Sequence, residues 1–145
     1  MFTLNFISQP QFSYQQKVVD EIVRNISKVV HKAQSGTLNL VFLDPDSIKN
    51  LNNIYRKKDT PTDVLSFHYF EDFSDVAPDD IAGEIVFCEE KIVSQWIEYG
   101  LGSEKEFYKL LIHSLLHILG YDHENDDDYE AMKLEEEKIW ESILK

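Results

Sequence analysis

The segment TLNLVFLDPDSIKNLNNIYR (residues 37–56) predicts a β-strand followed directly by an α-helix. Residues 37–43 have the apolar-rich composition of a strand. Asp44 can then cap a helix whose first turn contains Pro45, which lacks the N–H group that the start of a helix leaves unbonded. A strand joined this closely to a helix favours an α/β class of fold. The apolar residues that this helix would carry are Ile48, Leu51 and Ile54.

Comparable patterns continue on both sides of this segment. Apolar residues in alternating or continuous runs predict further strands over residues 3–7, 63–69 and 81–87. Helical spacing and end signals predict helices over residues 14–34, 89–99 and 103–119, and from residue 126 onward. No linker or repeat interrupts these elements. We therefore expect a single α/β (α+β) domain over residues 1–145, with a small mixed sheet of about four strands packed by about five helices.

Side-chain types also predict how individual helices end and which faces they bury. Gly36 is expected to end the helix over residues 14–34. Ser103 is expected to cap the helix over residues 103–119, with Glu106 at the capping-box position. The residues expected on the buried face of the last helix are Met132, Leu134, Ile139, Trp140 and Ile143.

The composition is that of an ordinary globular domain. The chain has 145 residues, of which 43% are hydrophobic and 28% charged. No apolar run exceeds four residues, whereas spanning a bilayer takes roughly 20, so we expect no membrane association. Cys88 is the only cysteine and cannot form an internal disulfide. This pattern is typical of a reducing, cytoplasmic compartment.

The charge distribution limits where a polyanion could bind. A net charge of −13 argues against indiscriminate binding to nucleic acid. However, residues 15–60 hold eight of the fourteen basic side chains and five acidic ones. Residues 101–145 hold five basic and twelve acidic side chains. A polyanion would therefore have to approach the first of these regions.

Three of the five histidines lie in the segment HSLLHILGYDH (residues 113–123). His113 and His117 are four residues apart on a predicted helix, so their side chains project from the same face. Gly120 suits the left-handed residue that ends a helix, and a reversal of the chain there can bring His123 to the same point. Three imidazoles with water in the fourth position form the coordination of a catalytic zinc. The sequence therefore predicts one Zn²⁺ at this helix and the loop that follows it.

Other metal sites are compatible with the same histidines. Cys88 or His68 could supply a fourth ligand from a distant part of the chain, which would make the site structural rather than catalytic. A site of three imidazoles would also accept nickel, cobalt or copper.

The spacing of the histidines is shared by the metzincin proteases, which suggests a second interpretation. Proteolysis in that class needs a glutamate directly after the first histidine as general base. Here that position is Ser114, which cannot take a proton from water near neutral pH. Zinc can lower the pKa of bound water to about 7 without that glutamate, so hydrolysis remains possible. Asp122 and Glu124 could orient a ligand histidine or the water, or they are ordinary loop acids.

Arg56 is a candidate phosphate-binding residue. It opens the segment RKKDTP (residues 56–61), in which two lysines follow and Pro61 stiffens the loop. The planar guanidinium suits bidentate contact with a phosphodiester. A merely solvated basic loop is the alternative.

Together these segments resemble the YbeY family of bacterial metal-dependent endoribonucleases. The resemblance lies in LNNIYRKKDTPTDVLSF (51–67), AGEIVF (82–87) and HSLLHILGYDHEND (113–126), in that order. The sequence departs from the family pattern at Ser114, where glycine is usual, at Glu84, where aspartate is usual, and at His68, where proline is usual.

The resemblance implies a fold and a function. It implies a mixed sheet with surrounding helices, zinc on His113, His117 and His123, and cleavage of single-stranded RNA with Arg56 and His113 as catalytic residues. It also implies a cytoplasmic enzyme that acts on ribosomal RNA, notably the 3′ end of the small-subunit RNA, and in ribosome quality control. The partners implied are the ribosome or ribosomal proteins and ribosome-assembly GTPases.

Two other functions remain open on the sequence alone. One is a metallohydrolase of peptides or small molecules, which the metzincin-like spacing suggests. The other is a non-catalytic metal-binding ribosome-assembly factor, in which the histidines fix the fold of the C-terminal segment.

Overall fold

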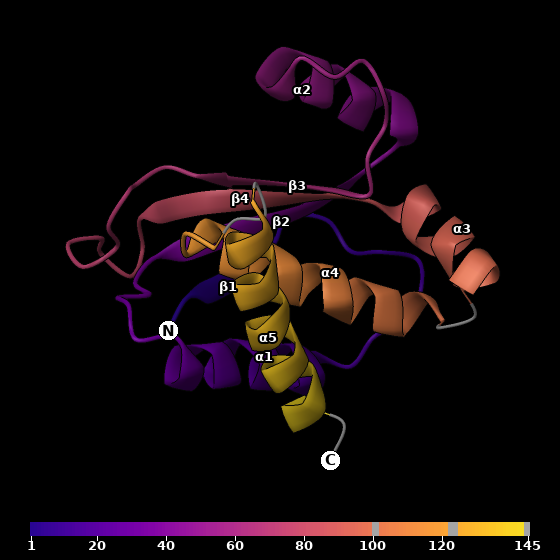
Figure 1. Ribbon diagram of the computed structural model, residues 1–145. Helices are drawn as coiled ribbons and strands as arrows, with labels where there is room; N and C mark the ends of the chain where they lie inside the picture. The colour runs from indigo at the N-terminus through magenta and orange to yellow at the C-terminus, as the bar shows by residue number, and fades with distance from the viewer. Residues whose placement is uncertain (100–101, 122–124, 144–145) are drawn as a thin grey trace.

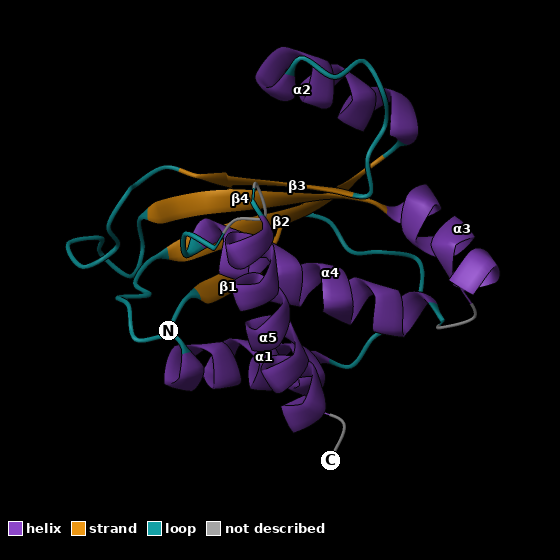
Figure 2. Ribbon diagram, viewed as in Figure 1, coloured by secondary structure: helices purple, strands orange, loops and turns teal. Residues whose placement is uncertain are grey.

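The computed structural model describes residues 1–99, 102–121 and 125–143, which form four strands and five helices. Figure 1 shows their order along the chain, and Figure 2 shows how helices and strands are arranged. The elements are β1 (Thr3–Phe6), α1 (Gln16–Val29), β2 (Thr37–Leu43), α2 (Pro45–Arg56), β3 (Val64–His68), β4 (Ile81–Cys88), α3 (Glu89–Tyr99), α4 (Ser103–Ile118) and α5 (Asp126–Ile143). Each expected strand and helix is present, most with bounds within one or two residues of the expectation.

The strands form one mixed sheet in the order β1-β2-β4-β3. β1 pairs with β2 and β2 with β4 in parallel, whereas β3 pairs antiparallel with β4 at the edge. The parallel register aligns Leu40 with Ile85, and the antiparallel register aligns Leu65 with Val86. The predicted fold class, with a small mixed sheet of four strands and five helices, is therefore confirmed.

Helices cover both faces of this sheet, as Figure 1 shows. α1, α4 and α5 pack together on one face, and α2 lies over the other. Successive side chains of a strand point to opposite faces, so Ile85 and Phe87 enter the larger core while Val86 and Cys88 enter a smaller cluster with Ile48 of α2. β4 is consequently buried on both sides.

The first helix is shorter than expected, and Gly36 does not end it. α1 ends at Val29, and Val30 is already extended with φ −94°. The side-chain amide of Gln34 donates to the carbonyl oxygens of Ile26 and Val30, at 3.4 and 3.1 Å, so it satisfies carbonyl groups at the helix end in place of a glycine cap. Gly36, at φ +116°, instead allows close packing at the start of β2, where a Cβ atom would lie 2.8 Å from that of Ala82.

The predicted start of α2 is confirmed. The Asp44 carboxylate accepts a hydrogen bond from the backbone N–H of Ser47 at 2.7 Å, and Pro45 occupies the first turn. Ile48 is buried as expected for an apolar residue of this helix, but Ile54 is 68% exposed. The helix ends at Lys57, which takes the left-handed conformation with φ 57°. Arg56 is therefore the last helical residue and stands at a sharp change in chain direction.

The predicted cap of α4 is wrong. Gly102, with φ 87°, is the N-cap, so Ser103 is already helical and makes no side-chain cap hydrogen bond. Glu106 is only 8% exposed and does not complete a capping box. Burial raises the pKa of the Glu106 carboxyl, an effect that nearby Lys109 opposes and Asp63 reinforces.

The predicted buried face of α5 is correct except for one residue. Met132 and Ile139 are buried, and Trp140 and Ile143 pack against the core. Leu134 is 57% exposed, because two helical positions after Met132 lie on the opposite side of the helix.

Replacing Glu106 by glutamine should raise the free energy of unfolding at pH 7 by less than about 1 kcal/mol. The pKa of Glu106 is higher in the folded protein, so the ionised side chain destabilises the fold above that pKa and the effect vanishes once both states are protonated. The gain should therefore disappear as the pH is lowered to about 4, near the unfolded-state pKa. Urea unfolding of the variant and the unaltered protein at pH 7 and at about pH 4 measures this difference in free energy.

The exposed residue Glu130 provides the control for this measurement. Glu130→Gln should leave the unfolding free energy nearly unchanged at both pH values. An equal effect of Glu106→Gln at pH 7 and pH 4 would contradict the electrostatic explanation.

Candidate functional site

α4 presents two histidines from its C-terminal half, which is otherwise buried. From Leu111 to Leu119 every residue is buried except His113 and His117, which are partly exposed. Their rings lie parallel, 5° apart in orientation, with centroids 6.5 Å apart. The predicted common face of these two histidines is therefore present in the fold.

Hydrogen bonds determine which ring nitrogen of each histidine carries the lone pair. His113 Nδ1 lies 2.6 Å from Glu136 Oε1, and His117 Nδ1 lies 3.1 Å from the backbone oxygen of Tyr121. A carbonyl oxygen and an ionised carboxylate can only accept hydrogen bonds, so each Nδ1 donates its proton. The lone pair of each neutral ring is then on Nε2. A second nitrogen held by an oxygen in this way is characteristic of metal-binding histidines, so this donor set fits a transition metal.

Gly120 takes the left-handed conformation that the sequence predicts for the end of α4. Gly120 has φ +103°, and the backbone N–H of Tyr121 donates to the carbonyl oxygen of Leu116 at 3.1 Å. The Lys32 ammonium donates to the carbonyl oxygen of Leu119 at 2.9 Å, which fixes this end of α4 against the segment after α1. His123, the third predicted ligand, lies outside the described residues.

The described residues contain two of the three predicted ligands. Among them, no three His, Cys, Asp or Glu side chains form a group that could hold a metal ion. Cys88 is buried in the apolar cluster beneath α2, where burial raises the pKa of its thiol, so a role for it as fourth ligand has no support. Asp122 and Glu124, the carboxylates expected to orient a ligand, lie outside the described part of the chain.

Glu136 is the orienting carboxylate that the sequence did not reveal. It lies on α5, within a run of charged residues that reads as an ordinary solvated helix face. Only the packing of α5 across α4, which Figure 1 shows, brings it to His113. The sequence gives only a weak indication of this role: Glu136 lies one helical turn from Met132 and from Ile139, both of which are buried.

Arg56 lies at the same surface hollow as His113. This hollow has a volume of about 370 Å³, and Lys109 and Glu136 also line it. α2 brings Arg56 there, and the loop after α2 is held by a 2.8 Å hydrogen bond from Asn52 Nδ2 to the backbone oxygen of Thr60. The fold thus joins two segments that are far apart in the sequence.

The carboxylates at this hollow have hydrogen-bond partners, whereas its cations have no ion-pair partner among the described residues. Asp63 accepts a hydrogen bond from Gln95 at 3.2 Å, and Glu136 is bonded to His113. Within the described part of the chain, neither Arg56 nor Lys109 forms an ion pair with a carboxylate. The two cations remain available to an anionic ligand.

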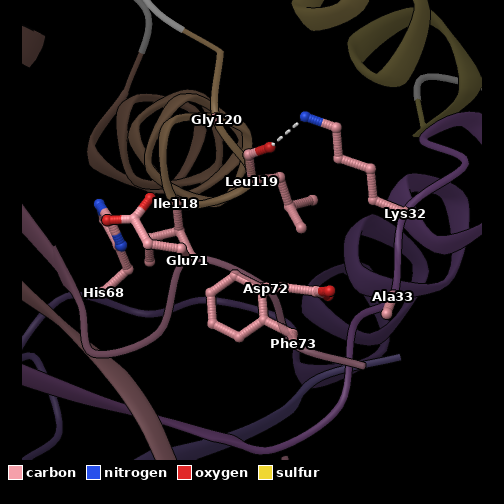
Figure 3. Close-up of a pocket in the computed structure, with 9 residues that line it drawn as sticks. All are labelled: Lys32, Ala33, His68, Glu71, Asp72, Phe73, Ile118, Leu119 and Gly120. Carbon is pink, nitrogen blue, oxygen red and sulfur yellow. Dashed lines mark hydrogen bonds between the residues drawn. The ribbon is translucent and has the colours of Figure 1, made fainter. Parts of the chain in front are cut away.

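His68 belongs to a different hollow, which is shown in Figure 3. This hollow has a volume of about 510 Å³ and lies beside the C-terminal end of α4, with Lys32 and Glu71 also at its wall. His68 Nδ1 lies 3.0 Å from the backbone oxygen of Phe70. The residues that line this hollow include neither Arg56 nor His113, so the structure does not place His68 with them.

Glu136→Gln should lower zinc affinity by about 10–100-fold while the fold stays intact, because the neutral amide supports His113 less strongly than a carboxylate does. A competition titration against a chromophoric chelator measures this affinity. The neighbouring exposed residue Glu137 provides the matched control, and Glu137→Gln should bind zinc as the unaltered protein does. Equal affinities for all three proteins would exclude a role for Glu136 in metal binding.

Comparisons with known proteins connect the chain to one family. The family model described as Endoribonuclease YbeY matches residues 5–144. An Endoribonuclease YbeY from Syntrophomonas wolfei is 37% identical over 134 residues, covering 88% of this chain and 86% of that protein. The Endoribonuclease YbeY of Neorickettsia sennetsu is 30% identical and covers 94% of both chains.

The fold is likewise similar to a solved structure. The solution structure of TM1509 from Thermotoga maritima matches with a TM-score of 0.59 and 27% identity, over 98% of this chain and 91% of that one. The matching family model spans the strand, arginine and histidine segments from which the site is built. The chain belongs to the endoribonuclease YbeY family.

Proposed function

We propose that this protein is a metal-dependent endoribonuclease that cleaves single-stranded ribosomal RNA. The observation that carries the proposal is that Arg56 and His113 line one hollow, although 57 positions separate them in the sequence. A guanidinium beside a metal-binding histidine suits a phosphodiester substrate. Family membership supports the same reaction, since the relatives are named endoribonucleases.

The metal would be held by His113, His117 and His123, the first two through Nε2. Zinc is the metal we propose, with other divalent transition metals as alternatives. When bound, such an ion supplies an activated water and stabilises charge on the phosphate.

The protein's own side chains have separate tasks in this proposal. Arg56 binds two oxygens of the phosphate and holds it against the site. Glu136 keeps the His113 ring in one orientation and one tautomer. Ser114 is 1% exposed, so its hydroxyl points into the protein and takes no part in the chemistry.

A single strand is the substrate form that suits this site. A flexible strand can bend one phosphate into a recessed hollow, whereas a rigid A-form duplex cannot do so easily. α5 begins with Asp126, Asp127 and Asp128, and this acidic turn would repel the dense charge of a duplex. The 3′ end of the small-subunit ribosomal RNA is the target we infer from the family resemblance.

Delivery of the RNA would depend on protein partners. With a net charge of −13, the protein has little non-specific attraction for nucleic acid, so ribosomal proteins or assembly GTPases would bring the substrate to it. No described helix is long and apolar enough to cross a membrane. We propose a cytoplasmic location and a role in ribosome quality control.

Cleavage assays on the zinc-loaded protein test this function. We expect it to cut an end-labelled single-stranded RNA and to spare the matching duplex and casein, with His117→Ala abolishing both stoichiometric zinc and cleavage. Zinc-dependent casein cleavage without RNA cleavage would favour the peptidase interpretation. Zinc binding with no cleavage of any substrate would favour a non-catalytic assembly factor.

Arg56→Lys should lower kcat/KM on single-stranded RNA by roughly 10–100-fold without changing zinc content, because lysine keeps the charge but loses bidentate contact with the phosphate. Arg24, on α1, is the other arginine of the chain and is exposed, so Arg24→Lys is the matched control and should be unaffected. Kinetics of Arg56→Lys equal to those of the control would remove Arg56 from the reaction.

A further inference from the structure

A second hollow continues the first along the surface between α4 and α5. It has a volume of about 200 Å³ and is lined by residues that include Lys109, Glu136, Lys133 and Trp140. Lys109 and Glu136 also line the hollow that contains Arg56 and His113. The two hollows therefore adjoin, and together they form what we call the α4–α5 groove.

Lys109 stands at the junction of these two hollows. It is exposed and lies one helical turn before His113 on α4. Its ammonium nitrogen is 5.2 Å from the ring centroid of Trp140, within the range of a cation–π interaction. This contact orients the lysine without cancelling its positive charge.

Lys109 has acidic neighbours but no ion-pair partner among the described residues. Glu136 lines both hollows with Lys109, Glu137 lines the second hollow and Asp63 the first. Glu106, one turn earlier on α4, is buried. The Lys109 ammonium therefore remains accessible to an anionic ligand.

We propose that Lys109 is a second phosphate-binding residue, which contacts a phosphate next to the one bound by Arg56, and that Trp140 is its positioning residue. This inference rests on the proposed RNA cleavage. Arg56 and Lys109, which share the first hollow, would bind consecutive phosphates of a strand, so substrates longer than a dinucleotide gain a contact that a dinucleotide cannot make. The α4–α5 groove then determines in which direction the bound strand leaves the site.

The first experiment compares Lys109→Gln with Lys105→Gln on single-stranded RNA of increasing length. Lys105 is exposed on the same helix, one turn earlier, and does not line either hollow of the groove, so it is the matched control. We expect Lys109→Gln to lower kcat/KM roughly tenfold on a ten-nucleotide strand, mainly through KM, and to leave a dinucleotide unaffected. Lys105→Gln should stay within about twofold of the unaltered protein.

Salt dependence provides a readout that a structural role would not change. Each lost phosphate contact should make the slope of log(kcat/KM) against log salt shallower by about 0.7 for a single strand. We expect this change for Lys109→Gln but not for Lys105→Gln. Lys109→Arg keeps the positive charge and should have the slope of the unaltered protein. An unchanged slope for Lys109→Gln, or an equal loss of activity on the dinucleotide, would overturn the proposal.

The role of Trp140 is tested through its coupling to Lys109. Trp140→Phe keeps an aromatic face and should retain most of the activity, whereas Trp140→Leu should resemble Lys109→Gln on the ten-nucleotide strand. Combined with Lys109→Gln, Trp140→Leu should cause no further loss, because the lysine it positions is already absent. Additive losses would show that Trp140 acts independently of Lys109, and thermal melts would identify any variant that is simply unfolded.

The outcome also separates this inference from the proposed function. If the unaltered protein cleaves RNA but Lys109→Gln behaves like the control, only the second phosphate contact is wrong. If the unaltered protein does not cleave RNA at all, the proposed function fails and this inference fails with it.

Discussion

The burial of the C-terminal half of α4 is the constraint on which the rest of the structure depends. The helix packs beneath the sheet and against α1, α3 and α5, and along this half every side chain except those of His113 and His117 is buried. A helix held this way cannot rotate without exposing Leu111 or Leu115, each of which would cost roughly 1.5–3 kcal/mol. His113 and His117 therefore have fixed directions before any ligand arrives. Pre-organisation of this kind lowers the cost of bringing ligands together around an ion.

The same packing explains how an acidic protein can leave two cations accessible at one hollow. Most acids of α5 face solvent, where they contribute to the net charge of −13. At the hollow, however, Glu136 is bonded to His113 and Asp63 to Gln95, whereas the two cations have no ion-pair partner among the described residues. The local field at a site depends on such pairings more than on total charge, because exposed charges are screened within about 8–10 Å at physiological salt.

Periodicity predicted the strands and helices well, because each is set by the side chains that it buries. The wrong predictions concern the helix ends, where the residue that caps a helix is not the one that the local sequence suggests. Gln34 satisfies the end of α1 in place of a glycine cap, and Gly102 starts α4 one residue before the expected cap. For the site, the spacing of His113 and His117 revealed their common face. The contribution of Glu136 could not be predicted, because its position depends on how α5 crosses α4 and not on any feature of its own segment.

Arg56 illustrates why a motif can point to a candidate functional residue but not to its site. Its position depends on where α2 begins and ends, which is set by the Asp44 cap and by the left-handed Lys57. It also depends on β3 being the edge strand, because an edge leaves room for the end of α2 and for α4 to approach the same strand from opposite faces of the sheet. If β3 were a central strand, a neighbouring strand on each side would separate the end of α2 from α4. The edge strand β3, whose first residue Val64 lines the hollow, therefore lies where the two distant segments meet.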